Sequence, residues 1–328
     1  MKLYTYKCLF LVIISVSSLY VSGKEEYKFG FGSCIEQNYP QPIWSAIEKE
    51  NIDSFIFLGD NVYGDEPSEG IQKLKMAYQK QKDVLPEWLN KKQIYAIWDD
   101  HDYGLNDGGS GFELRKESQE LYLDFWNIPI GDDRRKRSGI YFNKMKHIDD
   151  LKVHLIGLDT RFFRSDLLGI KLFHKPNTAK DATILGKEQW EWLQEVIRVD
   201  ADVIILLSSI QVLAENHPFE KWSLFPNEKL KLLDLINSSN IPTLIISGDR
   251  HKGGIYKKNN INEITSSSLN KPVSVNKLFK ETDPLMIGKI YNKENYGIIE
   301  INTQKKIIKF SLKDINGNLI QNGDIKLK

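Results

Sequence analysis

The sequence predicts an α/β protein in which helices cover a largely parallel sheet. Short apolar runs, rich in β-branched and aromatic residues, alternate with segments whose apolar residues recur at helical spacing. This alternation is typical of α/β domains. The 328 residues are 41% hydrophobic and 27% charged. That composition is close to the average of soluble globular domains and argues against collagen, disordered and multi-span membrane proteins.

Charge and cysteine content narrow the functional classes. Lys and Arg number 45 against 44 Asp and Glu, so the formal net charge is +1. There is no electrostatic case for dedicated nucleic-acid binding, although a local basic patch is compatible with this balance. Only two cysteines, Cys8 and Cys34, are present, which excludes a scaffold stapled by disulfides.

Residues 1–23 are predicted to be a secretory signal peptide. Two lysines precede an apolar run at 8–21, and small residues at 22–23 lead into a charged stretch. An uncleaved membrane anchor is the alternative, but the run is short for a span of about 20 residues. We therefore expect cleavage near Gly23, export to a periplasm or the cell exterior, and one domain at 24–328 without a membrane span.

The predicted elements follow in order along the chain. Six apolar runs are expected to be strands, at 27–33, 54–58, 93–98, 153–158, 203–207 and 243–247. Helices are expected from residue 42, and at about 69–89, 113–126, 187–199 and 228–236, with Asn227 capping the last. The basic run at 134–137 is expected to be a solvated loop.

Beyond residue 251 the predicted helices cease. Apolar runs at 254–256, 264–267, 296–301 and 306–312 are expected to be antiparallel strands that close the same domain. Gly and Asn residues around 314–323 indicate a terminal hairpin.

Small, acidic or imidazole side chains follow most of the predicted strands. Ligands of open α/β sheets bind outside the carboxyl ends of the strands, so these residues are expected to meet at one edge. A thiol, several carboxylates and two histidines at one edge indicate a metal site. The segments are Cys34, Gly59-Asp60, Asp99–His101, Asp159, Ser208-Ser209 and Gly248–His251.

Three of these segments carry acids in patterns suited to metal binding. In 59–63, glycine permits a sharp turn that presents Asp60, and Tyr63 lies close enough to fold back; an ordinary turn is the alternative. The ionisable groups of 99–102 are so close that they would repel one another or shift one another's pKa values unless cations lay between them. A solvated acidic turn is the alternative. An extended Asp249-x-His251 segment would direct both side chains the same way.

Cys34 ends the first predicted strand. A single cysteine is often a small buried hydrophobic residue. At an edge crowded with acids, however, a thiolate beside a phenolate suits a transition metal such as iron. Positions with only carboxylate and amide oxygens favour calcium, magnesium or manganese. The sequence therefore predicts an asymmetric site with one softer and one harder metal.

Taken together, these motifs resemble the PhoD-like (alkaline phosphatase D) branch of the metallophosphoesterases, within the calcineurin-like phosphoesterase superfamily. Any single motif is weak, whereas four in the family's order are specific. They are Gly32-Ser33-Cys34, Gly59-Asp60-Asn61-Val62-Tyr63, Asp99-Asp100-His101-Asp102 and Gly248-Asp249-Arg250-His251.

The resemblance implies a four-layer α/β/β/α sandwich of the metallophosphoesterase type with a dinuclear metal site. It assigns a ferric ion to Cys34, Asp60, Tyr63 and His251. It assigns a divalent ion, calcium first with manganese, magnesium or zinc as alternatives, to Asp60, Asp100 and Asp249, with Asn106 as a further candidate ligand. His101 matches the imidazole that lies near the phosphate in the wider superfamily.

The function implied is that of an exported metal-dependent phosphoester hydrolase, an alkaline phosphatase or phosphodiesterase acting on small phosphoesters. Metal-bound hydroxide would attack phosphorus in line, at a site bridged by Asp60, while His101 stabilises charge or protonates the leaving group. Arg161 and Arg250 are candidates for phosphate contacts, with structural ion pairs as the alternative, and His217 for shaping the substrate pocket. The alternative function is a catalytically inactive exported metal-binding or phosphate-binding protein.

Overall fold

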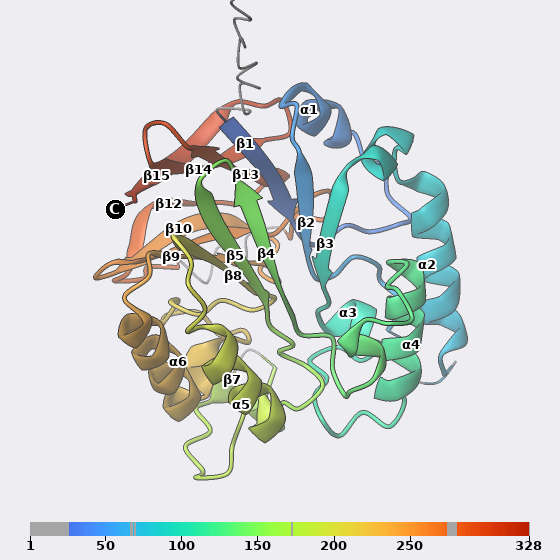
Figure 1. Cartoon of the computed structure of the whole chain (residues 1–328). Helices are drawn as coiled ribbons and strands as arrows, with labels where there is room; N and C mark the ends of the chain where they lie inside the picture. The colour runs from blue at the N-terminus through green and yellow to red at the C-terminus, as the bar shows by residue number, and fades with distance from the viewer. Residues whose placement is uncertain (1–25, 66–67, 69, 172, 274–280, 328) are drawn as a thin grey trace, which may run out of the picture.

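Two mixed β-sheets form the centre of the molecule (Figure 1). The computed structural model describes residues 26–327 apart from 66–67, 69, 172 and 274–280, so the predicted signal peptide lies outside the described residues. The first sheet has the order β15 (Leu319–Lys326), β14 (Ile307–Asp314), β13 (Asn295–Asn302), β1 (Glu26–Gly32), β2 (Ser54–Leu58), β3 (Gln93–Ile97). The second has the order β12 (Met286–Tyr291), β10 (Gly253–Lys258), β11 (Ile261–Ser266), β9 (Thr243–Ser247), β8 (Val203–Ser208), β5 (Leu151–Gly157), β4 (Phe142–Ile148).

Helices cover the outer faces of both sheets (Figure 1). The first sheet is covered by α1 (Trp44–Lys49), α2 (Gln72–Val84) and α4 (Arg115–Phe125), and the second by α5 (Gly186–Val196) and α6 (Pro226–Ser239). Three short helical segments lie in the connections, η2 (Glu87–Lys91), η3 (Asp133–Arg135) and η4 (Trp222–Leu224).

Side-chain alternation along β8 shows how the layers stack. Val203, Ile205 and Leu207 belong to the apolar core shared with the first sheet, whereas Ile204 and Leu206 pack with the apolar residues of α5 and α6. Successive side chains of a strand point to opposite faces, so β8 is buried on both. The layers are therefore helix, sheet, sheet and helix. The predicted four-layer α/β/β/α sandwich is confirmed.

The single sheet expected from strand and helix alternation alone is wrong. Parallel pairing joins β1 to β2 and β2 to β3 in one sheet, and β5, β8 and β9 in the other. Strands of either sheet have the same buried, apolar pattern, so pattern alone does not separate them. In addition, β11 pairs in parallel with β9, which corrects the expectation that every late strand is antiparallel. The terminal hairpin is confirmed as β14–β15.

Two local expectations also differ from the structure. Asn227 lies inside α6 and does not cap it, because the helix begins at Pro226, two residues before the predicted start. The fixed φ of proline suits the first helical position. The basic run is not simply solvated. Arg134 is 6% exposed, pairs through Nε with Asp132 at 2.9 Å, and lies 5.0 Å over the ring of Phe142.

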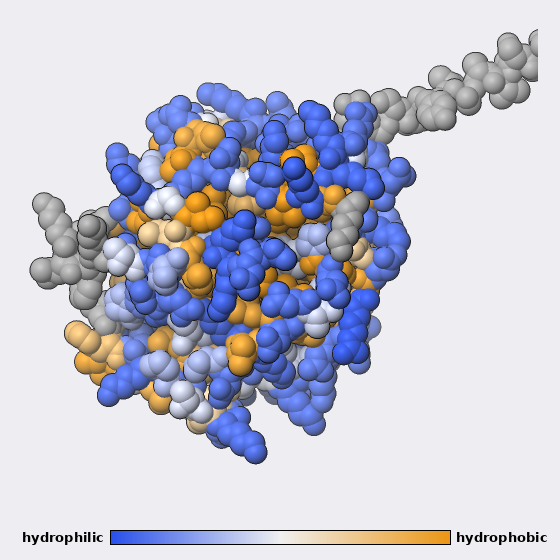
Figure 2. Space-filling view, turned by 90° about the vertical axis from the view of Figure 1, so that its left-hand side faces the viewer, coloured by the Kyte–Doolittle hydropathy of each residue, from blue (hydrophilic) through white to orange (hydrophobic). Residues whose placement is uncertain are grey.

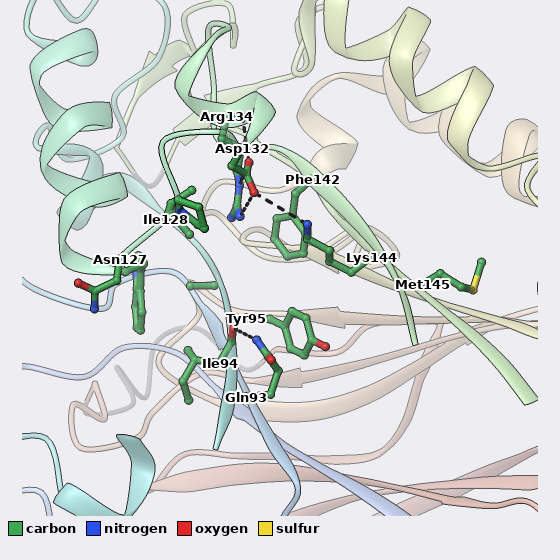
Figure 3. A pocket seen from close by; sticks show the side chains of 13 residues that line it. Gln93, Ile94, Tyr95, Asn127, Ile128, Asp132, Arg134, Phe142, Lys144 and Met145 are labelled. Carbon is green, nitrogen blue, oxygen red and sulfur yellow. Dashed lines mark hydrogen bonds and ion pairs between the residues drawn. The ribbon is translucent and has the colours of Figure 1, made fainter. Parts of the chain in front are cut away.

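These last residues line a cavity of about 450 Å³ between the edges of β3 and β4 (Figure 3). The side chains drawn there come from β3, β4 and the connection after α4, and Lys144 lies 3.9 Å from Asp132. None of the predicted site residues lines this cavity.

The molecular surface seen in Figure 2 is mainly hydrophilic, with scattered apolar side chains. Within the described part of the chain, no helix has both the length and the apolar character needed to cross a membrane.

Candidate metal centre

The carboxyl ends of strands from both sheets bring the predicted site residues together. Cys34 follows β1, Asp60 follows β2, and Asp249 and His251 follow β9. All four have positive φ, at 58°, 49°, 66° and 53° respectively. A non-glycine residue rarely adopts this left-handed conformation, and such residues cluster at functional sites. The chain thus turns sharply at each strand end and folds these side chains towards one another.

Gly59 shows how tightly two of these turns pack. Its φ is +99°, and a Cβ at this position would lie 2.5 Å from the Cβ of Asp99. Only glycine fits this approach without displacing the neighbouring backbone. Gly59 therefore sets the spacing between the loop after β2 and the loop that leads from β3 into α3 (Asp100–Tyr103).

Three overlapping groups of side chains have the composition and spacing of metal sites. In each group the potential ligand atoms lie within 4.8 Å of one another. Asp60 belongs to two groups and Asp100 to two, so neighbouring cations could share these carboxylates. The groups are Cys34 with Asp60 and His251, Asp60 with Asp100 and His101, and Asp99 with Asp100 and Asp249.

The first group mixes sulfur, oxygen and nitrogen donors. Cys34 Sγ lies 3.3 Å and Tyr63 Oη 3.1 Å from the same oxygen, Asp60 Oδ2. Tyr63 Oη is also 3.5 Å from His251 Nε2. Burial, followed by the charge of Asp60, raises the pKa of both the Cys34 thiol and the Tyr63 phenol. A bound cation would reverse that electrostatic balance, and this donor set suits a transition metal.

His251 is oriented for ligation. Its Nδ1 donates to the backbone carbonyl of Lys271, and its backbone N–H donates to Ser267 Oγ at 2.8 Å. Burial lowers the pKa of His251 to about 4, which favours the neutral ring. A neutral ring with Nδ1–H bound to a carbonyl directs the Nε2 lone pair towards Tyr63 and the cluster.

Unpaired oxygens on three buried carboxylates show that cations would fit this site. Asp60 Oδ1, Asp99 Oδ2 and Asp100 Oδ1 are buried and have no hydrogen-bond partner in the described part of the chain. Burial, then neighbouring carboxylates, raises the pKa of Asp249. Unpaired buried charges are costly unless they are paired or coordinate metals. Cations between these oxygens would satisfy them, so the residues fit the metal centre that the motifs predict.

His101 has a partner that sequence reasoning missed. Its Nδ1 lies 2.5 Å from Asp65 Oδ1, and its ring centroid is 4.3 Å from that of Tyr63. Burial alone would lower the pKa of His101, but the charges of Asp100 and Asp60 and the contact with Asp65 raise it to about 10. The imidazole is therefore both fixed in place and favoured in its charged form. The sequence signal was an acid five positions after Asp60.

Asp102 ties the two acidic loops together. Its carboxylate accepts from the backbone N–H of Asp99 at 2.5 Å and of Asp60 at 3.2 Å, and from Asn61 Nδ2 at 2.5 Å. The first of these bonds belongs to a capping box at the start of α3. Asp102, the last residue of the Asp99–Asp102 motif, thus holds the two loops together and is not one of the donor groups.

Arg161 lies in a buried ion network. Its side chain is fully buried, with Nη2 at 2.6 Å from Asp99 Oδ1 and Nη1 at 2.5 Å from Glu220 Oε2. Arg164 reaches the other oxygen of Glu220 at 2.8 Å. These are the contacts of the structural ion pair considered as the alternative for Arg161. A contact between Arg161 and phosphate stays a prediction.

Arg250 and His217 both contact Phe219. Arg250 lies 4.6 Å over the ring of Phe219 and pairs with Glu281. His217 Nδ1 accepts from the backbone N–H of Phe219 at 3.3 Å. Burial, then the nearby charge of Arg250, lowers the pKa of His217. Substrate contacts by both residues stay predictions.

The Asn106 side chain is hydrogen-bonded to two neighbouring residues. Its Nδ2 donates to Asp107 Oδ2 at 2.8 Å, and its Oδ1 accepts from Lys171 Nζ at 3.2 Å. The amide is thus hydrogen-bonded to its neighbours, and its role as a ligand stays a prediction.

Sequence reasoning also missed Lys271, whose Nζ lies 3.3 Å from the centroid of the Tyr63 ring.

Comparisons with known proteins identify the fold. No family model and no curated protein matches the sequence. The solved structure of PhoD aligns with a TM-score of 0.71 over 92% of this chain and 69% of that chain, at 17% identity. The chain therefore has the PhoD fold. GAP50, described as the anchor in the inner membrane complex of Plasmodium, aligns with a TM-score of 0.65 over 93% of this chain and 90% of that chain, at 14% identity.

Proposed function

We propose that the protein is an exported, metal-dependent phosphoester hydrolase. The observation that carries the proposal is the set of buried, unpartnered carboxylate oxygens of Asp60, Asp99 and Asp100 beside the imidazole of His101, which Asp65 holds in place. Such a site combines a place for cations with a positioned acid, which are the groups that phosphoester hydrolysis requires. The PhoD fold is consistent with this activity.

The residues that would hold the metals divide by donor type. Cys34, Asp60, Tyr63 and His251 would hold ferric iron. Asp60, Asp100 and Asp249 would hold a divalent ion, calcium first, with manganese, magnesium or zinc as alternatives. When bound, the two ions would lower the pKa of water and neutralise charge that develops on phosphoryl oxygens.

The chain's own residues supply orientation and a proton. Asp65 holds Nδ1 of His101, so Nε2 remains for the leaving-group oxygen, to which it would donate a proton. Lys271 pairs with Glu36 at 2.8 Å and places its ammonium group over Tyr63, where it adds positive charge beside the cluster. A phosphoester would therefore meet cationic groups on this side.

Steady-state hydrolysis tests the proposal. We would assay purified protein, supplied with iron and each divalent ion in turn, on a chromogenic phosphomonoester and a bis-phosphodiester. Loss of the positioned acid in His101→Asn is expected to lower kcat by about 10²–10⁴-fold. Asp65→Asn should lower kcat less and shift the pH profile, because it releases the imidazole without removing it. The exposed His147→Asn is the matched control.

No hydrolysis of either substrate under any metal condition would overturn the hydrolase proposal. Metal bound without turnover would favour the alternative, a non-catalytic exported metal-binding or phosphate-binding protein. The likeness to GAP50, the anchor in the inner membrane complex of Plasmodium, is consistent with that alternative.

Elemental analysis with a visible spectrum tests the metal assignment. A Tyr63-to-iron charge-transfer band should be present and should disappear in Tyr63→Phe. A colourless, iron-free but active protein would refute the iron assignment. N-terminal sequencing of secreted protein should begin near Lys24 if the export proposal holds.

A further inference from the structure

A small hairpin stands apart from both large sheets. It consists of β6 (Leu168–Ile170) and β7 (Phe173–Lys175), which form a separate two-stranded sheet in the described part of the chain. In the view of Figure 1, β7 lies at the lower end of the molecule, as do α5 and α6. Because each strand has one partner, each also has one free edge.

The hairpin exposes three large apolar side chains. Leu168, Ile170 and Phe173 are 44%, 71% and 65% exposed and belong to neither apolar core. No other six-residue stretch of the described chain exposes three large apolar residues. A cluster of this kind, unlike single exposed residues, marks an interaction site.

Positive charge accompanies these apolar residues. The stretch 168–175 contains Lys171 and Lys175 and no acid, in a chain whose formal net charge is +1. The Lys171 side chain is 62% exposed, and its Nζ lies 3.9 Å from Asp107 Oδ2. An exposed pair at that distance contributes little, so Lys171 is available to another anion.

We propose that the β6–β7 hairpin binds the surface of an anionic lipid bilayer. Aromatic and aliphatic side chains partition into the interfacial region, while lysines extend to lipid phosphates and are attracted by the negative surface potential. The free strand edges limit penetration, because unpaired backbone groups are costly in hydrocarbon. The hairpin is therefore expected to lie at headgroup level.

The small size of the hairpin favours a lipid surface over a protein partner. Stable protein interfaces bury about 800 Å² on each partner and about 20–30 residues a side. Among the described residues of the hairpin, the exposed large apolar side chains are Leu168, Ile170 and Phe173. Three such side chains with two lysines are enough for reversible interfacial binding, which adds apolar burial to electrostatic attraction.

The hairpin also lies near the candidate metal centre. Lys171 contacts Asn106 and Asp107, and the backbone N–H of Asp107 donates to Asp100 Oδ2 at 2.7 Å. Binding through the hairpin would thus hold the site close to lipid headgroups. The lipid-binding proposal does not depend on the hydrolase proposal, and binding is measured without turnover.

Vesicle co-sedimentation of the full mature chain tests the proposal. The protein is expected to bind vesicles of phosphatidylcholine with phosphatidylserine, and to bind more weakly as salt is raised. Combining Leu168→Ser, Ile170→Ser and Phe173→Ser should reduce the partition coefficient at least ~10-fold. Combining Lys171→Ser and Lys175→Ser should reduce it by about 10-fold on the anionic vesicles alone.

The matched control places the same change on other exposed apolar residues. Met76 and Ile130 are 71% and 89% exposed, and Met76→Ser with Ile130→Ser should leave vesicle binding unchanged. Circular dichroism of each variant checks that the fold persists.

Absence of binding to anionic vesicles would overturn the proposal, as would equal binding to neutral vesicles or binding unaffected by both hairpin variants. Self-association of the free protein that the apolar variant abolishes would assign the hairpin to protein contacts instead.

Discussion

Replacement of Glu220 should lower the stability of the protein strongly. Its side chain is 1% exposed; it accepts a hydrogen bond from Arg161 Nη1 at 2.5 Å and forms an ion pair with Arg164 Nε at 2.8 Å. Glu220→Gln preserves shape but removes the negative charge. Arg164 then loses its buried ion-pair partner, while Arg161 retains Asp99. The variant thus leaves a buried guanidinium uncompensated.

The size of the effect follows from this burial. Removal of one partner of a buried pair costs about 3–5 kcal/mol because the other charge remains desolvated. With about 2.1 cal/mol/K per residue over roughly 300 residues, the unfolding entropy is about 0.6 kcal/mol/K. The expected fall in Tm is therefore about 5–8 °C if unfolding is cooperative.

Denaturant and thermal unfolding followed by circular dichroism would measure the change. The control is Glu191→Gln, because Glu191 is 63% exposed and lies 3.8 Å from the exposed Lys187. Such a surface pair contributes less than about 1 kcal/mol. A loss for Glu220→Gln no larger than that of the control would refute the view that this buried network depends on the Glu220 charge.

Three further perturbations have defined outcomes. Gly59→Ala should reduce metal content and stability together, since its Cβ would meet the side chain of Asp99; unchanged metal content by elemental analysis would contradict this. Hydrogen bonds from Arg134 lower the pKa of Asp132 below the unfolded value of about 3.9. The stabilisation by the Asp132 carboxylate is thus full above about pH 5, begins to fall near the unfolded pKa of about 3.9, and is lost progressively down to the lowered pKa of the folded state, so Asp132→Asn should be somewhat less destabilising at pH 3.5 than at pH 7. Chelation should lower Tm, and added metal should restore it; a Tm unaffected by chelation would count against a bound metal.

Much of the site could be predicted because its residues sit at strand ends. Asp60 and Asp249 follow short apolar strands whose identity is plain in the sequence, and carboxyl ends of parallel strands meet at one edge. Placement at strand ends thus selected the right side chains, while the packing of the two sheets brings the two sets of strand ends together. The three donor groups confirm convergence for Cys34, Asp60, Asp99–His101, Asp249 and His251, and do not include Asp159 or Ser208-Ser209.

The contacts that support the site could not be predicted in the same way. Asp65 reaches His101, and Glu220 reaches Arg161, through tertiary packing that joins residues 36 and 59 positions apart in the chain. The strand β4 was missed because polar and charged residues dominate its sequence at the edge of the second sheet. Edge strands tolerate such residues, which weakens their signal.

The donors come from two sheets, and this has a consequence for folding kinetics. Cys34 and Asp60 follow strands of the first sheet, whereas Asp249 and His251 follow β9 of the second. The donors become neighbours only when the sheets have packed, late in any pathway that must close such long loops. A metal that binds this arrangement would act after the rate-limiting step. It should therefore slow unfolding in proportion to its affinity and leave the refolding rate nearly unchanged.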